Sequence, residues 1–102
     1  MTPPLAIVTG GSTGIGRHLA TALAAAGYSV AFSYRSSNDA AAALLTELNA
    51  GGARAFGMEC DAGMKAEVDR FYAAVADWHG DAPNLLVNNA GVQTWSDRKS
   101  VV

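Results

Sequence analysis

The stretch Thr9–Gly16, which reads TGGSTGIG, decides the fold of this chain. It follows the short apolar run Leu5–Val8, which is typical of a strand buried on both faces, and apolar residues at helical spacing begin at Ile15. A glycine-rich turn from strand to helix can present backbone N–H groups to a pyrophosphate at the positive end of the helix. It is not a Walker loop, because no Gly-Lys-Ser or Gly-Lys-Thr follows. A glycine-rich turn without a ligand is the alternative.

The small residues of this turn have different expected tasks. Gly10 allows the tight turn, Gly14 lets the backbone approach a ligand closely, and Gly16 lets the helix pack tightly on the strand. The hydroxyl groups of Ser12 and Thr13 can add hydrogen-bond donors. The pattern therefore favours a phosphate-binding turn.

Apolar runs and helical stripes alternate along the rest of the chain. The expected strands are residues 5–8, 29–34, 53–60 and 85–87. The expected apolar faces of three helices are Ile15, Leu19, Ala22, Leu23 and Ala26; Ala41, Leu44, Leu45 and Leu48; and Val68, Phe71, Tyr72, Val75 and Trp78. Strands separated by helices of this length predict βαβ units on a parallel sheet. Right-handed crossovers then place the first two helices on one face and the third on the other, with strand order 3-2-1-4. The fold class is therefore α/β, the first half of a doubly wound Rossmann sheet, with a ligand crevice where the strand order reverses.

The composition narrows the class of protein. The chain has 102 residues, of which 50% are hydrophobic and 16% are charged. It can therefore form at most one globular domain. A formal charge of -2 and the lack of a basic stripe argue against nucleic acid as a partner. No apolar stretch approaches the ~20 residues that span a bilayer, and the N-terminus is not a secretory signal. Cys60, the single cysteine, is expected to be a small buried residue, and no Cys/His spacing suits a metal. We therefore expect a cytoplasmic protein without a membrane or metal contact.

Two motifs together resemble the short-chain dehydrogenase/reductase family. The first is Thr-Gly-x-x-x-Gly-Ile-Gly in Thr9–Gly16, and the second is Asn-Asn-Ala-Gly in Asn88–Gly91, after the fourth expected strand. The likeness runs from about Leu5 to Trp95, and Asn88–Trp95 looks closest to the glucose dehydrogenase and 3-oxoacyl-carrier-protein reductase branch. The resemblance implies an oxidoreductase that acts on an alcohol, a sugar or a ketone with a dinucleotide cofactor, and a homo-oligomeric complete protein.

The same resemblance implies further cofactor contacts. It assigns Asp61 to the amino group of the adenine, where a carboxylate is a good acceptor; an ordinary turn aspartate before Gly63 is the alternative. It places Asn89, Ala90 and Gly91 along the cofactor ribose, against the alternative of a plain loop. The expected cofactor-binding residues are Gly10, Ser12, Thr13, Gly14, Ile15, Gly16, Arg35, Asp61, Asn89, Ala90 and Gly91.

The choice of cofactor depends on the end of the second strand. An acidic residue there binds the ribose 2′-hydroxyl of NAD, whereas an arginine accommodates the 2′-phosphate of NADP. The stretch Ser33–Ser37 holds Arg35 and has no carboxylate before Asp39, so NADP is the expected cofactor. A solvated arginine is the alternative. NAD stays open as well, because many NADP-dependent relatives carry a basic residue where this chain has Thr13.

The catalytic pair of the family is not present. Relatives use a tyrosine and a lysine four residues later, but Phe32, Asn38 and Ala76 stand four residues beyond the three tyrosines of this chain. His18 and His79 have no partner at useful spacing and are interpreted as structural or exposed. A family domain of ~250 residues also exceeds this chain. We expect a truncated, catalytically inactive copy of an enzyme; a natural nucleotide-binding module without activity is the alternative.

The segment Ser96–Val102 is expected to lie outside the family pattern, so that residues 1–95 form the N-terminal part of the Rossmann domain. The common sequencing-adapter string GATCGGAAGAGCGTCGTG, read in frame, encodes Asp-Arg-Lys-Ser-Val-Val, and a stop codon follows. These six residues are Asp97–Val102. The tail is therefore interpreted as an artefact without function.

Overall fold

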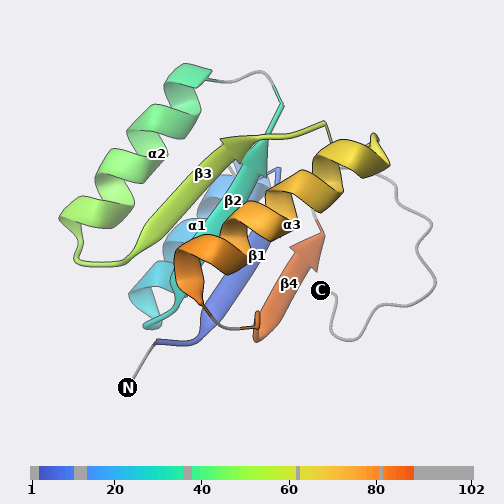
Figure 1. Cartoon of the computed structure of the whole chain (residues 1–102). Helices are drawn as coiled ribbons and strands as arrows, with labels where there is room; N and C mark the ends of the chain where they lie inside the picture. The colour runs from blue at the N-terminus through green and yellow to red at the C-terminus, as the bar shows by residue number, and fades with distance from the viewer. Residues whose placement is uncertain (1–2, 11–13, 36–37, 62, 81, 89–102) are drawn as a thin grey trace.

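The computed structural model describes residues 3–10, 14–35, 38–61, 63–80 and 82–88. In these ranges the elements follow the order β1 (Leu5–Thr9), α1 (Gly14–Ala25), β2 (Ser29–Tyr34), α2 (Asn38–Ala50), β3 (Ala55–Glu59), α3 (Lys65–His79) and β4 (Leu85–Asn88). The strands form one parallel sheet in the order β3-β2-β1-β4 (Figure 1). The predicted half of a doubly wound sheet, with its reversal between β1 and β4, is confirmed.

Strand β1 lies at the centre of this sheet because it is apolar on both faces. It pairs with β2 from Leu5 opposite Ser29 and with β4 from Ala6 opposite Leu85. Leu5 and Ile7 pack toward α3, whereas Val8 packs toward α1 and α2, and all three are fully buried. A strand covered on both faces needs the continuous apolar run that the sequence shows, not an alternating one.

The core between the sheet and helices α1 and α2 is built around Phe32. This ring packs with Leu44 and Leu48 of α2 and with Ala20 of α1. Its neighbour in register on β3 is Gly57, and a Cβ atom at that glycine would lie 2.7 Å from Cζ of Phe32. Only a residue without a side chain leaves room for the ring, so the sheet accepts a glycine inside a strand at this point.

The apolar face of α1 differs from the predicted one. Ile15 was expected in the core but is 70% exposed, and the buried residues of α1 are Gly16 and Ala20. Ile15 stands in the first turn of the helix, where the helix has only just left the edge of the sheet. Leu19 and Leu23 pack against the core as partly buried residues, as predicted, whereas Ala22 and Ala26 of the predicted face are exposed.

Helix α3 covers the other face of the sheet (Figure 1). Val68, Phe71 and Val75 are buried there, as their spacing predicts. The C-terminal end of α3 is fixed by Arg54, whose Nη2 donates to the carbonyl oxygen of Trp78 at 3.2 Å and whose guanidinium lies over the Trp78 ring. None of the helices in the described ranges is long and apolar enough to cross a membrane.

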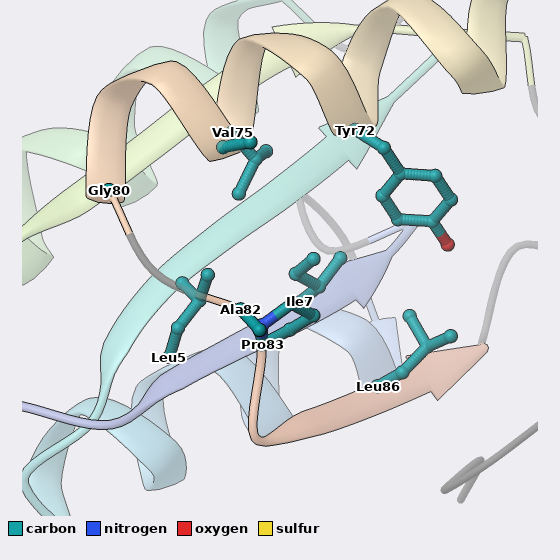
Figure 2. Close-up of a pocket in the computed structure, with 9 residues that line it drawn as sticks. Leu5, Ile7, Tyr72, Val75, Gly80, Ala82, Pro83 and Leu86 are labelled. Carbon is teal, nitrogen blue, oxygen red and sulfur yellow. The ribbon is translucent and has the colours of Figure 1, made fainter.

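An apolar hollow of about 500 Å³ lies beside α3 (Figure 2). It is lined by Leu5 and Ile7 of β1, Leu86 of β4, and Tyr72 and Val75 of α3, and the turn before β4 closes it. Among the described strands, β4 is an edge of the sheet. The hollow is therefore the part of this face that α3 leaves uncovered.

Candidate functional site

The turn after β1 has the backbone that its glycines predict. Gly10 follows the last residue of β1 with a φ of 68°, and Gly14 opens α1 with a φ of 58°. Both values lie in the left-handed region, which favours glycine over every residue with a side chain. The N–H of Gly10 donates to Oγ of Ser33 at 3.3 Å, which ties the start of the turn to β2. Helix α1 thus begins at the carboxyl edge of the sheet, with its positive end toward the crevice.

Of the other residues expected in the turn, the structure describes two, Ile15 and Gly16. Gly16 is buried against the sheet, consistent with close helix–strand packing, and Ile15 is exposed beside the crevice. Ser12 and Thr13 lie outside the described residues.

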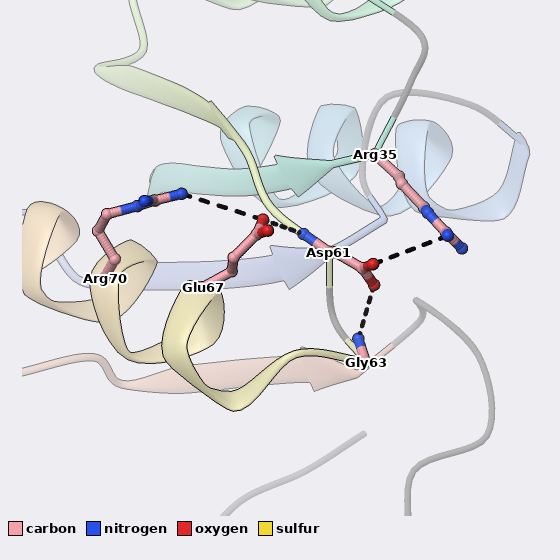
Figure 3. Close-up of polar contacts among 5 residues, drawn as sticks. All are labelled: Arg35, Asp61, Gly63, Glu67 and Arg70. Atoms are coloured by element: carbon pink, nitrogen blue, oxygen red, sulfur yellow. Dashed lines mark hydrogen bonds and ion pairs between the residues drawn. The ribbon is translucent and has the colours of Figure 1, made fainter.

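Arg35 and Asp61 lie side by side at the same sheet edge. Arg35 comes directly after β2, and Asp61 is the second residue after β3. Because β2 and β3 are parallel neighbours, their carboxyl ends meet, and Nη2 of Arg35 lies 3.7 Å from Oδ2 of Asp61 (Figure 3). The Arg35 side chain is 78% exposed and that of Asp61 is 30% exposed. The neighbouring ends of β2 and β3 therefore place one exposed cation beside one carboxylate that is less exposed.

Asp61 is held in place by three hydrogen bonds. Its carbonyl oxygen accepts the N–H of Met64 at 2.9 Å, and the other two are drawn in Figure 3. Its Oδ1 accepts the N–H of Gly63 at 2.9 Å, and its own N–H donates to Oε1 of Glu67 at 2.8 Å. Nη2 of Arg70 lies 4.0 Å from the same Glu67 oxygen. Glu67 was not among the predicted site residues. The sequence signal for it is only partial. A glutamate at the third position of a helix typically accepts the N–H of the N-cap residue, but here the N–H of Met64 donates to the Asp61 carbonyl oxygen and Glu67 accepts the Asp61 N–H instead.

Cys60 lies beside this network but is not a reactive group. The side chain is buried, as expected for a small core residue. Burial raises the pKa of the Cys60 thiol, and the negative charges of Glu67 and Asp61 raise it further. The thiol is therefore protonated at neutral pH, and a protonated thiol is a poor nucleophile and metal ligand. In the described part of the chain, no three His, Cys, Asp or Glu side chains gather into a metal site.

The remaining predicted contacts follow β4. Asn88 is the last residue of β4 and pairs in register with Thr9, whose Oγ1 donates to the carbonyl oxygen of Val87 at 3.3 Å. Asn89, Ala90 and Gly91 lie outside the described residues. The structure thus brings Gly10, Gly14, Ile15, Gly16, Arg35 and Asp61 to one edge of the sheet. Their contacts with a cofactor stay a prediction.

The hydrogen bond between Asp61 and Glu67 gives a direct test of this local architecture. Glu67→Ala leaves the Asp61 N–H without its acceptor and should lower the free energy of unfolding by about 1 kcal/mol. Glu67→Gln keeps an acceptor oxygen at the same reach and should restore part of that loss. Urea unfolding and hydrogen exchange of the Asp61 amide measure the effect. If Glu67→Ala has the same stability and the same Asp61 amide exchange as the unaltered chain, this bond contributes nothing.

The parallel order β3-β2-β1-β4 and the glycine turn at its reversal define a doubly wound α/β protein. The sequence model of the family described as short chain dehydrogenase matches residues 4–101. The chain is 40% identical over 87 residues to a 3-oxoacyl-(acyl-carrier-protein) reductase of Staphylococcus epidermidis, covering 85% of this chain and 35% of that protein. A reductase of the same name from Synechocystis is 38% identical over 92 residues, covering 90% of this chain and 37% of that protein.

Solved structures agree with these sequence relatives. A blue fluorescent protein from a metagenomic library, in complex with NADPH, matches with a TM-score of 0.83 and 39% identity, over 89% of this chain and 37% of that one. A short chain dehydrogenase from Burkholderia cenocepacia, in complex with NADP, matches with a TM-score of 0.84 and 38% identity, over 89% and 37%. The chain belongs to the short-chain dehydrogenase/reductase family. It lies near the 3-oxoacyl-(acyl-carrier-protein) reductase branch.

The chain spans about a third of the length of the curated relatives it matches. The family match continues past Trp95, where the family pattern was expected to end. The boundary at that residue stays a prediction, because residues 89–102 lie outside the part of the chain that the structure describes.

Proposed function

We propose that this chain is the dinucleotide-binding part of an oxidoreductase that prefers NADP and acts on an alcohol, a sugar or a ketone. The observation that carries the proposal is the meeting of the glycine turn, Arg35 and Asp61 at the carboxyl edge of the sheet. Ligands of doubly wound folds bind at that edge, where the strand order reverses. The NADPH and NADP complexes of two similar proteins support this choice of cofactor, and NAD is the alternative.

Each part of the site has a proposed task. The Gly10–Gly16 turn and the N-terminus of α1 hold the pyrophosphate through backbone N–H groups, which need no side-chain charge. Arg35 pairs with the 2′-phosphate, for which a guanidinium is the best-suited side chain. Asp61 accepts a hydrogen bond from the adenine amino group. Asn89, Ala90 and Gly91 are proposed to follow the ribose, with Ser12 and Thr13 as further donors to phosphate oxygens.

Hydride transfer itself needs a group that moves a proton to or from the reacting oxygen. The 102 residues contain no Tyr-x-x-x-Lys. We infer that the chain binds a dinucleotide without turning it over, and that substrate selection and self-association belong to a complete, homo-oligomeric protein.

Isothermal titration of this chain with NADP and with NAD tests the proposal. Charge-assisted hydrogen bonds to the 2′-phosphate should make NADP bind about tenfold or more tightly than NAD. With a panel of alcohols, sugars and ketones, the absorbance of the reduced nicotinamide should not change. Binding of neither dinucleotide at millimolar concentration would refute the proposed function, and measurable turnover would refute the inferred inactivity.

A further inference from the structure

The ion pair of Arg35 with Asp61 joins the two subsites that the proposed function gives to the 2′-phosphate and the adenine. Every other ion pair between described residues lies within α3 or between α1 and α2. This one alone, among the described residues, links the ends of two strands at the crevice. A nucleotide in the crevice would therefore meet a preformed contact between two of its own partners.

The two members of the pair are held very differently. The Asp61 carboxylate is fixed by the N–H of Gly63, and its backbone by Glu67. The Arg35 side chain is 78% exposed, and 3.7 Å is longer than the roughly 2.7–2.9 Å of a charge-assisted hydrogen bond. Attraction between charges, without a directional hydrogen bond, keeps the guanidinium near the carboxylate. Arg35 is therefore the partner that can turn away, and Asp61 is the one that stays.

We propose that the Arg35–Asp61 pair is a latch that a 2′-phosphate opens, so that Asp61 reduces the preference for NADP over NAD. The inference rests on the proposed function. A 2′-phosphate carries more negative charge than a carboxylate and draws the guanidinium away from Asp61. A dinucleotide with a 2′-hydroxyl has no such charge and leaves the pair closed. Binding of NADP therefore breaks the Arg35–Asp61 pair, which weakens it, whereas binding of NAD leaves the pair intact.

The latch is tested by the ratio of the dissociation constants of NAD and NADP, measured by titration at low salt, where exposed pairs are least screened. Asp61→Asn keeps the size of the side chain and an oxygen for the Gly63 N–H. Its effect on the adenine cancels in the ratio, since both dinucleotides carry the same adenine. The ratio should rise about threefold, as expected for loss of an exposed ion pair. Asp61→Ser is a second variant with a small acceptor and should act in the same direction.

The decisive comparison repeats Asp61→Asn in an Arg35→Ala background. A latch needs both partners, so the substitution should then leave the ratio unchanged. The matched control is Asp77→Asn, which removes the same charge from an exposed position near the C-terminal end of α3 and should not alter the ratio.

Other outcomes overturn the latch. A rise that persists without Arg35 means that Asp61 repels the phosphate directly. A fall means that Asp61 instead holds Arg35 ready for the phosphate, and no change means that the pair has no role in cofactor choice. If the unaltered chain binds neither dinucleotide, the proposed function fails and the latch fails with it. If it binds NADP and the ratio behaves otherwise than stated, only the latch is refuted.

Discussion

Phe32→Ala should lower the free energy of unfolding of this chain by about 3–5 kcal/mol, the usual cost of deleting a fully buried phenylalanine. The ring is fully buried between the sheet and α2. Truncation leaves a void that Leu44 and Leu48 cannot fill unless α2 shifts toward the sheet. A loss of this size is a large fraction of the roughly 5–15 kcal/mol by which native proteins are stable, so the variant should unfold at a lower urea concentration than the parent. Urea titration followed by circular dichroism measures the loss.

The neighbouring glycine supplies the control. Gly57→Ala places a methyl group against the ring and should cost about 1–3 kcal/mol by overpacking. In a Phe32→Ala background the same methyl group enters the void, and its cost should vanish or change sign. Strictly additive effects of the two substitutions would contradict the packing described for this pair.

Arg35→Asp should invert the cofactor preference, which is the largest expected effect on binding. The substitution removes the cation proposed for the 2′-phosphate and places a second carboxylate beside Asp61 at the end of β2. A carboxylate there repels the 2′-phosphate but can accept a hydrogen bond from a 2′-hydroxyl. We expect NADP binding to weaken about 100-fold or more, because a lost charge-assisted bond and a new repulsion act together. NAD binding should be unchanged or improved.

Arg17→Asp is the matched control for this charge reversal. Arg17 lies early in α1 and pairs with Glu47 of α2, so it is nearer to the proposed pyrophosphate turn, which both dinucleotides share, than to the proposed 2′-phosphate partner. It should lower stability slightly and leave the NAD to NADP ratio where it was. A ratio that stays constant in Arg35→Asp would reduce Arg35 to a solvated surface cation, the alternative raised from the sequence.

The fold could be predicted because two local signals agree. Leu5–Val8 is apolar without alternation, which places β1 inside the sheet, and the right-handed crossover rule then fixes the strand order. The first and last residues of the individual strands were less predictable than the fold. The third strand was expected over residues 53–60 but spans Ala55–Glu59, because pairing with β2 begins only at Ala55. The hydrophobic pattern predicts that a strand is present, but its pairing with the neighbouring strand decides at which residue the strand begins and ends.

The site was predicted only where a residue type carries its own signature. The glycines predict the positive φ that Gly10 and Gly14 have, whereas the anion expected at Arg35 stays a prediction. Arg35 and Asp61 are far apart in the chain, so the sequence does not give the distance between their side chains. That distance depends on the register of β2 against β3. Ile15 was misplaced for a related reason: helical period does not show where the sheet stops covering the helix.

The parallel pairing of β1 has a consequence for how the chain reaches its native state. Leu5 finds Ser29 on one side, and on the other its N–H donates to the side chain of Asn84, 79 residues later in the sequence. No strand in the described sheet pairs with one that a tight hairpin could bring to it. Contacts of such long sequence separation slow the search for the folded state. During synthesis on the ribosome, one side of β1 stays unpaired until almost the whole described chain has emerged. For that time the unpaired backbone of this apolar strand can pair with other chains.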